Sequence, residues 1–162
     1  MTIGVGDRLP GANLMRMGAE GPEKVALEEI LAGRRVVIFG LPGAYTGLCS
    51  TAHVPSFIRS MEALRAKGVD EVLCIAVNDP FVMRAWGETT GAAEAGITLL
   101  GDPGCEWVSA IGMEFSNLDR GFIRRCKRFA LMAEDGVVKV WHPEEGTGTC
   151  DISGGESMVE AL

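Results

Sequence analysis

Apolar residues in the first half of the chain form two short runs with a helical repeat between them. Residues 35–40 (RVVIFG) are rich in β-branched side chains, which is typical of a strand buried on both faces. Pro42 and Gly43 break this run. Apolar side chains at helical spacing then predict a helix over 49–67, and a second apolar run predicts another buried strand over 71–77.

The elements that follow complete this alternation. Asp79 and Pro80 predict the cap and first turn of another helix. Strand, helix, strand and helix in this order predict a parallel βαβ unit with a right-handed crossover. Further along, 128–133 and 137–141 read as two strands joined by a tight turn at Asp135-Gly136, which is a strong hairpin signal.

Shorter segments are predicted from weaker patterns. They are a strand at 12–17, a turn at 18–21, a short helix at 25–31, a strand at 97–100, a short helix that starts at Asp102-Pro103, and a C-terminal helix at 156–162. A parallel half followed by an antiparallel half indicates an α/β, thioredoxin-like fold with a central mixed β-sheet flanked by helices. The 162 residues fit one domain, residues 1–162.

Charge and composition exclude several classes of function. The net charge of -7 disfavours nucleic acid and anionic membranes as main partners. The N-terminal residues lack a basic region followed by an apolar stretch, so we expect neither a signal peptide nor a membrane span. Five cysteines, an odd number without zinc spacing, favour a reducing, cytoplasmic location and no metal site. No nucleotide or other cofactor motif is present.

Cys49 is the candidate reactive residue because of its place at the predicted start of a helix. Unpaired amide groups and the helix dipole favour negative charge there. A free cysteine is only roughly 3% thiolate at pH 7, and the thiolate is the nucleophile, so such stabilisation would matter. His53 follows Cys49 on the same helix face, where it could act as a base, although a packing or hydrogen-bonding histidine is the favoured interpretation.

The segment PGAYTGLC, residues 42–49, resembles the PxxxTxxC active-site signature of peroxiredoxins. The stretch VNDPFVMRAW (77–86) and the strand start RFA (128–130) resemble the type II, atypical two-cysteine subfamily. One departure is Gly47, where that subfamily commonly has proline. The resemblance implies a thiol-dependent peroxidase that reduces hydrogen peroxide and alkyl hydroperoxides, and it implies a homodimer packed near the Cys49 loop.

The resemblance also implies roles for individual residues. Cys49 is the expected peroxidatic nucleophile, and Pro42 is the expected shield over its thiolate. Thr46, Arg128 and the backbone N–H groups around Gly43 and Cys49 are the expected donors toward the peroxide. Cys105, Cys126 and most of the basic run 120–128 are expected to be structural or solvated.

Attack on a peroxide leaves a sulfenic acid on Cys49, which a second thiol must resolve. Cys150, in a glycine-rich loop, is favoured over Cys74, which lies in a predicted buried strand. Direct reduction by thioredoxin, glutaredoxin or glutathione is a third route. The alternative to an enzyme is a thioredoxin-fold peroxide sensor or holdase in which oxidised Cys49 signals to a partner.

Overall fold

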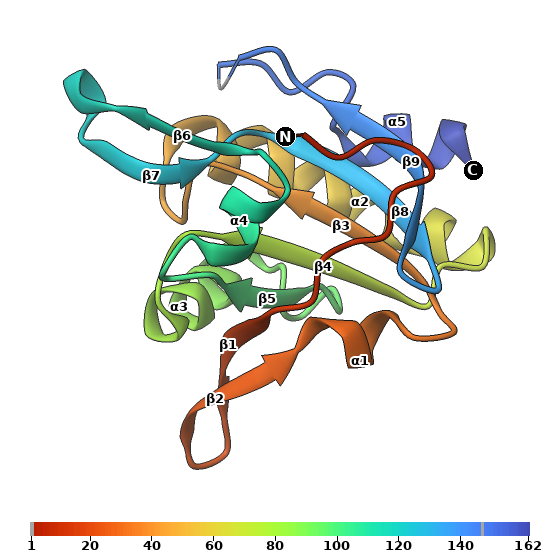
Figure 1. The fold of residues 1–162 in the computed structure, drawn as a ribbon, viewed down its shortest axis with the longest axis horizontal. Helices are drawn as coiled ribbons and strands as arrows, with labels where there is room; N and C mark the ends of the chain where they lie inside the picture. The colour runs from red at the N-terminus through yellow and green to blue at the C-terminus, as the bar shows by residue number, and fades with distance from the viewer. Residues whose placement is uncertain (1, 147) are drawn as a thin grey trace.

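The structure is a computed structural model that describes residues 2–146 and 148–162. Its main sheet has the strand order β2-β1-β5-β4-β3-β8-β9 and is flanked by helices (Figure 1). The strands of this sheet are β1 (Asn13–Gly18), β2 (Gly21–Ala26), β3 (Arg35–Gly40), β4 (Glu71–Ala76), β5 (Thr98–Gly101), β8 (Phe129–Glu134) and β9 (Val137–Pro143). The helices are α1 (Leu27–Leu31), α2 (Val54–Ala66), α3 (Pro80–Thr90), α4 (Glu106–Ala110) and α5 (Gly155–Ala161).

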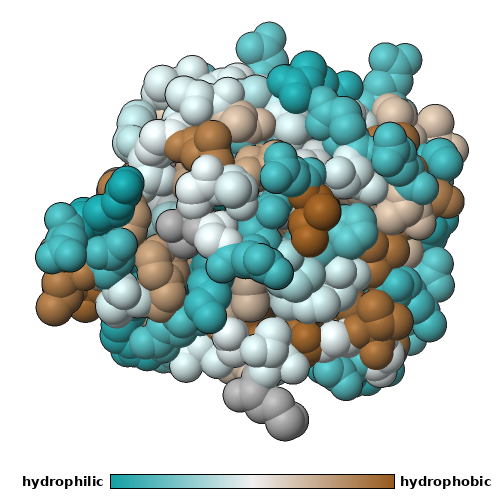
Figure 2. Space-filling model, turned by 90° about the horizontal axis from the view of Figure 1, so that it is seen from above, coloured by the Kyte–Doolittle hydropathy of each residue, from teal (hydrophilic) through white to brown (hydrophobic). Residues whose placement is uncertain are grey.

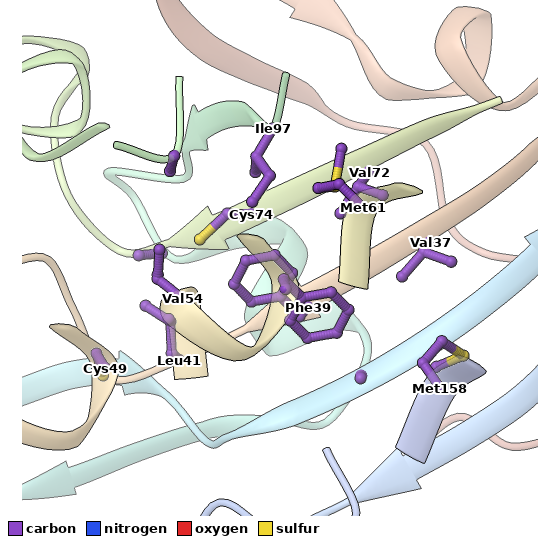
Figure 3. Packing of buried hydrophobic residues seen from close by; sticks show 14 of the residues in the cluster. Val37, Phe39, Leu41, Cys49, Val54, Met61, Val72, Cys74, Ile97 and Met158 are labelled. Atoms are coloured by element: carbon purple, nitrogen blue, oxygen red, sulfur yellow. The ribbon is translucent and has the colours of Figure 1, made fainter. Parts of the chain in front are cut away.

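Alternate side chains of β3 enter two separate hydrophobic cores. Val37 and Phe39 pack on the face covered by α2, α3 and α5, while Val36 and Ile38 pack on the face covered by α1 and α4. Such two-sided burial is why the strand reads as a continuous apolar run. Phe39 stacks on Phe57 of α2 with ring centroids 4.1 Å apart, and Figure 3 shows Phe39 within this layer. This packing fixes the start of α2 against the end of β3.

The predicted βαβ unit and the final hairpin are confirmed. Strands β3 and β4 are parallel, and β8 runs antiparallel to β3 on its other side, so the central sheet is mixed as expected. Asp79 caps α3, where its carboxylate accepts a hydrogen bond from the Val82 N–H at 2.9 Å. Asp135 and Gly136 both have positive φ angles, 49° and 78°, as the tight turn between β8 and β9 requires.

The prediction for residues 18–31 was partly wrong. Residues 21–26 form β2, which pairs with β1 in an antiparallel hairpin, and only Leu27–Leu31 is helical. The apolar spacing of Val25, Leu27, Ile30 and Leu31 suggested a longer helix, but Val25 lies in β2, and Leu27 and Leu31 are the buried residues of the short helix. β2 has exposed residues at its centre and pairs with β1 at the edge of the sheet, so it shows no apolar run.

A third hairpin was not predicted at all. It consists of β6 (Glu114–Asn117) and β7 (Phe122–Cys126), joined by a 3₁₀ turn at Leu118–Arg120. The hairpin projects from the left of the molecule in Figure 1, and in Figure 2 that end carries hydrophobic and hydrophilic side chains together. The hairpin contains much of the basic run, in which Arg120 and Arg124 are exposed as expected of a solvated face, whereas Arg125 is half-buried.

Candidate active site

Cys49 lies beyond the carboxyl end of β3, at the first position of a π-helical turn, Cys49–His53, that leads into α2. The Val54 N–H bonds to the Cys49 carbonyl, five residues back. Pro55 accounts for the widened turn, because proline has no N–H for the carbonyl four residues earlier and its ring needs room there. Cys49 therefore begins the helix as predicted, although its first turn is π rather than α. Turns of this kind are frequent at functional sites.

Arg128 brings a positive charge to the Cys49 sulfur. Its side chain is 1% exposed, and its Nη2 donates to Cys49 Sγ at 3.4 Å. The same guanidinium donates from Nη1 to His53 Nδ1 at 2.9 Å. The structure thus places Arg128 where the resemblance implied, directly before β8, which is the neighbour of β3 in the sheet. The Cys49 sulfur therefore accepts a hydrogen bond from a buried, positively charged side chain.

His53 holds the arginine and is not placed as a base for Cys49. Its Nδ1 accepts from Arg128, so the proton sits on Nε2, which donates to the Ser153 carbonyl at 2.9 Å. Burial, and then the charge of Arg128, lower the pKa of His53 from 6.5 to about 3, against the opposing effect of the Ser153 hydrogen bond. The imidazole is therefore neutral near pH 7. The favoured interpretation, a hydrogen-bonding histidine, is confirmed.

The loop that carries Ser153 is held by Glu144. Glu144 Oε2 accepts from the Ser153 N–H at 2.9 Å, from the Ser153 hydroxyl at 2.6 Å and from the Asp151 N–H at 2.7 Å. The Glu144 N–H in turn donates to the Arg128 carbonyl at 3.0 Å. Burial alone would raise the pKa of Glu144, but the hydrogen bonds from Ser153 and Asp151 outweigh it and lower the pKa. A continuous chain of contacts therefore runs from Glu144 through Ser153, His53 and Arg128 to Cys49.

The loop between β3 and Cys49 is tied down by groups from two other elements. Asn78 Oδ1, after β4, accepts from the Ala44 N–H at 2.9 Å, and Arg125 Nη1 of β7 donates to the Pro42 carbonyl at 3.0 Å. Gly43 is needed here because its φ is +153° and a Cβ atom would collide with Arg125. The Thr46 hydroxyl donates to the Gly43 carbonyl at 2.7 Å, so its lone pairs, and not its proton, remain for a ligand.

A cavity of about 370 Å³ opens over this loop. Four of the residues that line it, Pro42, Thr46, Leu48 and Arg128, belong to the site already described or flank Cys49. The others are Gly47, Gly148 and three residues of the unpredicted hairpin, Asn117, Arg120 and Phe122. The structure therefore brings three of the predicted site residues, Pro42, Thr46 and Arg128, to one cavity, with Cys49 buried at the start of the adjacent turn.

The two candidate resolving cysteines differ in their surroundings. Cys74 is fully buried in β4, between β3 and β5, and Figure 3 shows it within the hydrophobic layer. Burial first, and then Cys49 and Cys126, raise the pKa of Cys74 well above its usual value. Cys150 is partly exposed in the loop held by Glu144, with the Ser153 hydroxyl 4.0 Å from its sulfur. Burial raises the pKa of Cys150, and Ser153 and Arg128 oppose this effect.

Four positioning residues escaped the sequence analysis: Glu144, Ser153, Asn78 and Arg125. Asn78, Arg125 and Ser153 contact residues 34, 83 and 100 positions away along the chain, and Glu144 acts through Ser153, so no local pattern marks them. Asn78 had one signal, its place directly after a buried strand. Cys105 and Cys126 are buried as expected, and among the described residues no cluster of side chains could hold a metal ion.

This fold, with a buried cysteine paired to an arginine at the end of a central strand, defines a thiol-based redox protein. Comparison with known proteins makes the class specific. The Redoxin family model matches residues 4–159. Peroxiredoxin-2E-2, a chloroplastic protein of Oryza sativa subsp. japonica, is 47% identical and aligns with 99% of this chain and 73% of its own length. Peroxiredoxin-2C of the same plant is 41% identical, with 99% and 98% covered.

Solved structures agree with the sequence relatives. Reduced Prx3 of Vibrio vulnificus, crystallised with hydrogen peroxide, has a TM-score of 0.91 and 36% identity, with 99% of each chain covered. The chain belongs to the Redoxin family and, within it, to the peroxiredoxins, which are thiol-dependent peroxidases. The predicted family, fold and enzyme class are confirmed, and the sensor or holdase alternative is not favoured.

The comparisons identify the enzyme class but not the cellular location. No helix among the described residues is long and apolar enough to cross a membrane. The relatives include chloroplastic and mitochondrial proteins, so the cytoplasmic assignment stays a prediction.

Proposed function

We propose that Cys49 is the peroxidatic nucleophile of this peroxidase. The observation that supports this role is the 3.4 Å contact from Arg128 to a cysteine that is 1% exposed beside the cavity. Among the described cysteines, Cys49 alone has an arginine donating to its sulfur. Cys74, Cys105 and Cys126 are buried, and burial is the leading cause that raises the pKa of each.

The proposed reaction starts from the Cys49 thiolate and a hydroperoxide, ROOH. The sulfur attacks the terminal oxygen, an S–O bond forms, the O–O bond breaks, and the electron pair leaves with RO, which takes up a proton to become ROH. Arg128 donates where negative charge develops on the oxygens. The Thr46 hydroxyl donates its proton to the Gly43 carbonyl, so it accepts a hydrogen bond from the peroxide O–H; this replaces the donor role expected from sequence. Pro42, buried and without an N–H, shields the sulfur from water.

The experiment that tests this role compares Cys49→Ser with the matched control Cys105→Ser. The first variant should consume no hydrogen peroxide above background in a thioredoxin-coupled assay, and the second should turn over near the parent rate. Consumption by Cys49→Ser at the parent rate would assign the nucleophile to another residue.

For the second half of the cycle, we propose that Cys150 resolves the sulfenic acid. The Cys150 thiol attacks the Cys49 sulfur, an S–S bond forms and water leaves; a dithiol such as reduced thioredoxin or glutaredoxin then supplies two electrons. Cys74 would have to leave a strand paired on both sides, whereas Cys150 lies in a partly exposed loop that Arg128 already influences. Glutathione or glutaredoxin acting directly on Cys49 is the competing route.

Peptide mapping after one equivalent of peroxide distinguishes these routes. A Cys49–Cys150 disulfide, within one chain or between two, supports the proposal. A Cys49–Cys74 disulfide would show that strand β4 opens, and a stable sulfenic acid would leave reduction to an external thiol.

The same proposal includes a homodimer that packs near the Cys49 loop. Tyr45 of that loop is 56% exposed and contacts Thr89 of α3, and Phe81 of the same helix is 57% exposed. Exposed aromatic side chains of this kind are enriched at protein interfaces. Sedimentation at micromolar concentration, with Tyr45→Ser as the perturbed variant, measures the assembly; a parent protein that sediments as a monomer would contradict it.

A further inference from the structure

The cavity beside Cys49 is larger than hydrogen peroxide needs. Its volume is about 370 Å³, whereas a water molecule occupies roughly 30 Å³ in the liquid. Volumes above about 300 Å³ are typical of sites for organic ligands. Pro42, Leu48 and Phe122 supply apolar surface to its wall, so the bulk of such a ligand can be hydrocarbon.

The charged side chains that line the cavity, among the described residues, are all positive. The charged residues among the described lining residues are Arg120 and Arg128, and no carboxylate is among them. This contrasts with a chain whose net charge is -7. Arg125 adds to the positive charge because its guanidinium lies 5.5 Å from the centre of the Phe122 ring. A positive cavity in an acidic protein favours an anionic ligand locally.

Arg120 differs from the other arginines of the run. Arg124 forms an ion pair with Glu114 at 3.1 Å, Arg125 donates to the Pro42 carbonyl, and Arg128 contacts Cys49 and His53. Within the described part of the chain, Arg120 forms no ion pair. It is exposed at the end of the 3₁₀ turn, with Asn117 on the same cavity wall. Arg120 is thus free to pair with a ligand.

We propose that this cavity takes organic hydroperoxides that carry a carboxylate, with Arg120 binding the carboxylate while the peroxide group reaches Cys49. The proposal rests on the proposed function of Cys49. The hydrocarbon part contacts Leu48 and Phe122, and Asn117 can donate a further hydrogen bond to the anion. A guanidinium suits this role because its fork of N–H groups matches a carboxylate. The reaction itself is unchanged: Cys49 becomes a sulfenic acid and the hydroperoxide becomes the corresponding alcohol.

The test uses cumene hydroperoxide bearing a para-carboxylate and the methyl ester of the same compound. Stopped-flow rate constants for the oxidation of the reduced protein give a carboxylate-to-ester ratio for each variant. Arg120→Gln should lower this ratio about five-fold, which corresponds to about 1 kcal/mol for a partly exposed pair. Arg120→Lys should recover part of the loss. The matched control is Arg84→Gln, an exposed arginine on α3 that lines a different pocket, and it should leave the ratio unchanged.

Each other outcome has a definite meaning. An equal ratio in the parent protein and in Arg120→Gln would overturn the proposal, and so would an equal drop in Arg84→Gln, which would reveal a net-charge effect. A parent protein that consumes hydrogen peroxide but shows no preference between the two probes would overturn the proposal and leave the function of Cys49 intact. Failure of the parent protein to consume any peroxide would instead overturn the proposed function itself.

Discussion

Replacing Arg128 by methionine tests the central electrostatic contact of the site. Methionine keeps much of the side-chain length but removes the donor that lies 3.4 Å from Cys49 Sγ. Loss of one preorganised donor to a transition-state oxyanion costs about 2.7 to 4 kcal/mol, which corresponds to a rate loss of roughly 100-fold to 1000-fold. We expect the second-order rate constant for oxidation of Cys49 by hydrogen peroxide to fall by this factor.

The same substitution also affects folding, and the two effects must be separated. Without Arg128, the buried His53 Nδ1 loses its partner at 2.9 Å, and an unsatisfied buried polar group costs about 1 to 3 kcal/mol. Urea unfolding measures this cost directly. Arg128→Lys keeps a positive charge but has no fork to reach both partners, so its rate should lie between those of the parent protein and Arg128→Met.

The assay is stopped-flow fluorescence, since Trp86 donates from its indole N–H to Ser50 within the turn that begins at Cys49. Arg125→Met is the matched control because Arg125 donates to the Pro42 carbonyl, so its loss should loosen the loop and reduce the rate less than loss of Arg128 does. An unchanged rate in a folded Arg128→Met variant, or a larger loss in Arg125→Met, would refute the assignment of Arg128.

Three further predictions concern the residues that hold the site. The unfolded state protonates His53 near pH 6.5 and the folded state near pH 3, so the free energy of unfolding should fall by about 1.2 kcal/mol as pH drops from 6 to 5. Urea titrations of His53→Gln at both pH values should show a smaller change in the free energy of unfolding with pH. Glu144→Gln should release the loop held through Ser153, and mass spectrometry should detect roughly 10-fold faster alkylation of the thiol in that loop; an unchanged rate would show that other contacts hold the loop. Gly43→Ala should displace Arg125 and lower the melting temperature by several degrees, whereas a normal melting curve would mean that the loop adapts.

The sequence predicted well those parts of the site that depend on residues close together along the chain. An apolar run, a proline-glycine break and a helical repeat place Cys49 between β3 and α2, and the structure agrees because the same residues that form these elements also pack them together. The role of Arg128 was predicted only from the resemblance to peroxiredoxins. Arg128 lies beside Cys49 because β8 pairs with β3. The π-helical first turn was missed because one proline, Pro55, alters hydrogen bonding without changing the apolar spacing.

The supporting contacts could not be predicted in this way. His53 and Ser153 are 100 residues apart along the chain, and Arg128 and His53 are 75 apart. Periodicity describes which face of an element is buried, and it carries no information on which distant polar group will meet a given side chain. His53 was accordingly interpreted only as a packing or hydrogen-bonding residue. Ser153 and Glu144 had no distinguishing feature in the sequence.

The basic run 120–128 shows how a single compositional feature can conceal several structural roles. As a charge cluster it predicts one solvated face. In the structure, Arg124 pairs across the hairpin strands with Glu114, Arg125 donates to the Pro42 carbonyl, and Arg128, which lies between the hairpin and β8, is buried against Cys49. The Phe115 and Phe122 rings lie 6.0 Å apart across the two strands, but polar and charged residues around them conceal the strand alternation in the sequence. Because this hairpin lines the cavity without supplying the nucleophile, substitutions in it can change which peroxides enter while the chemistry at Cys49 stays the same.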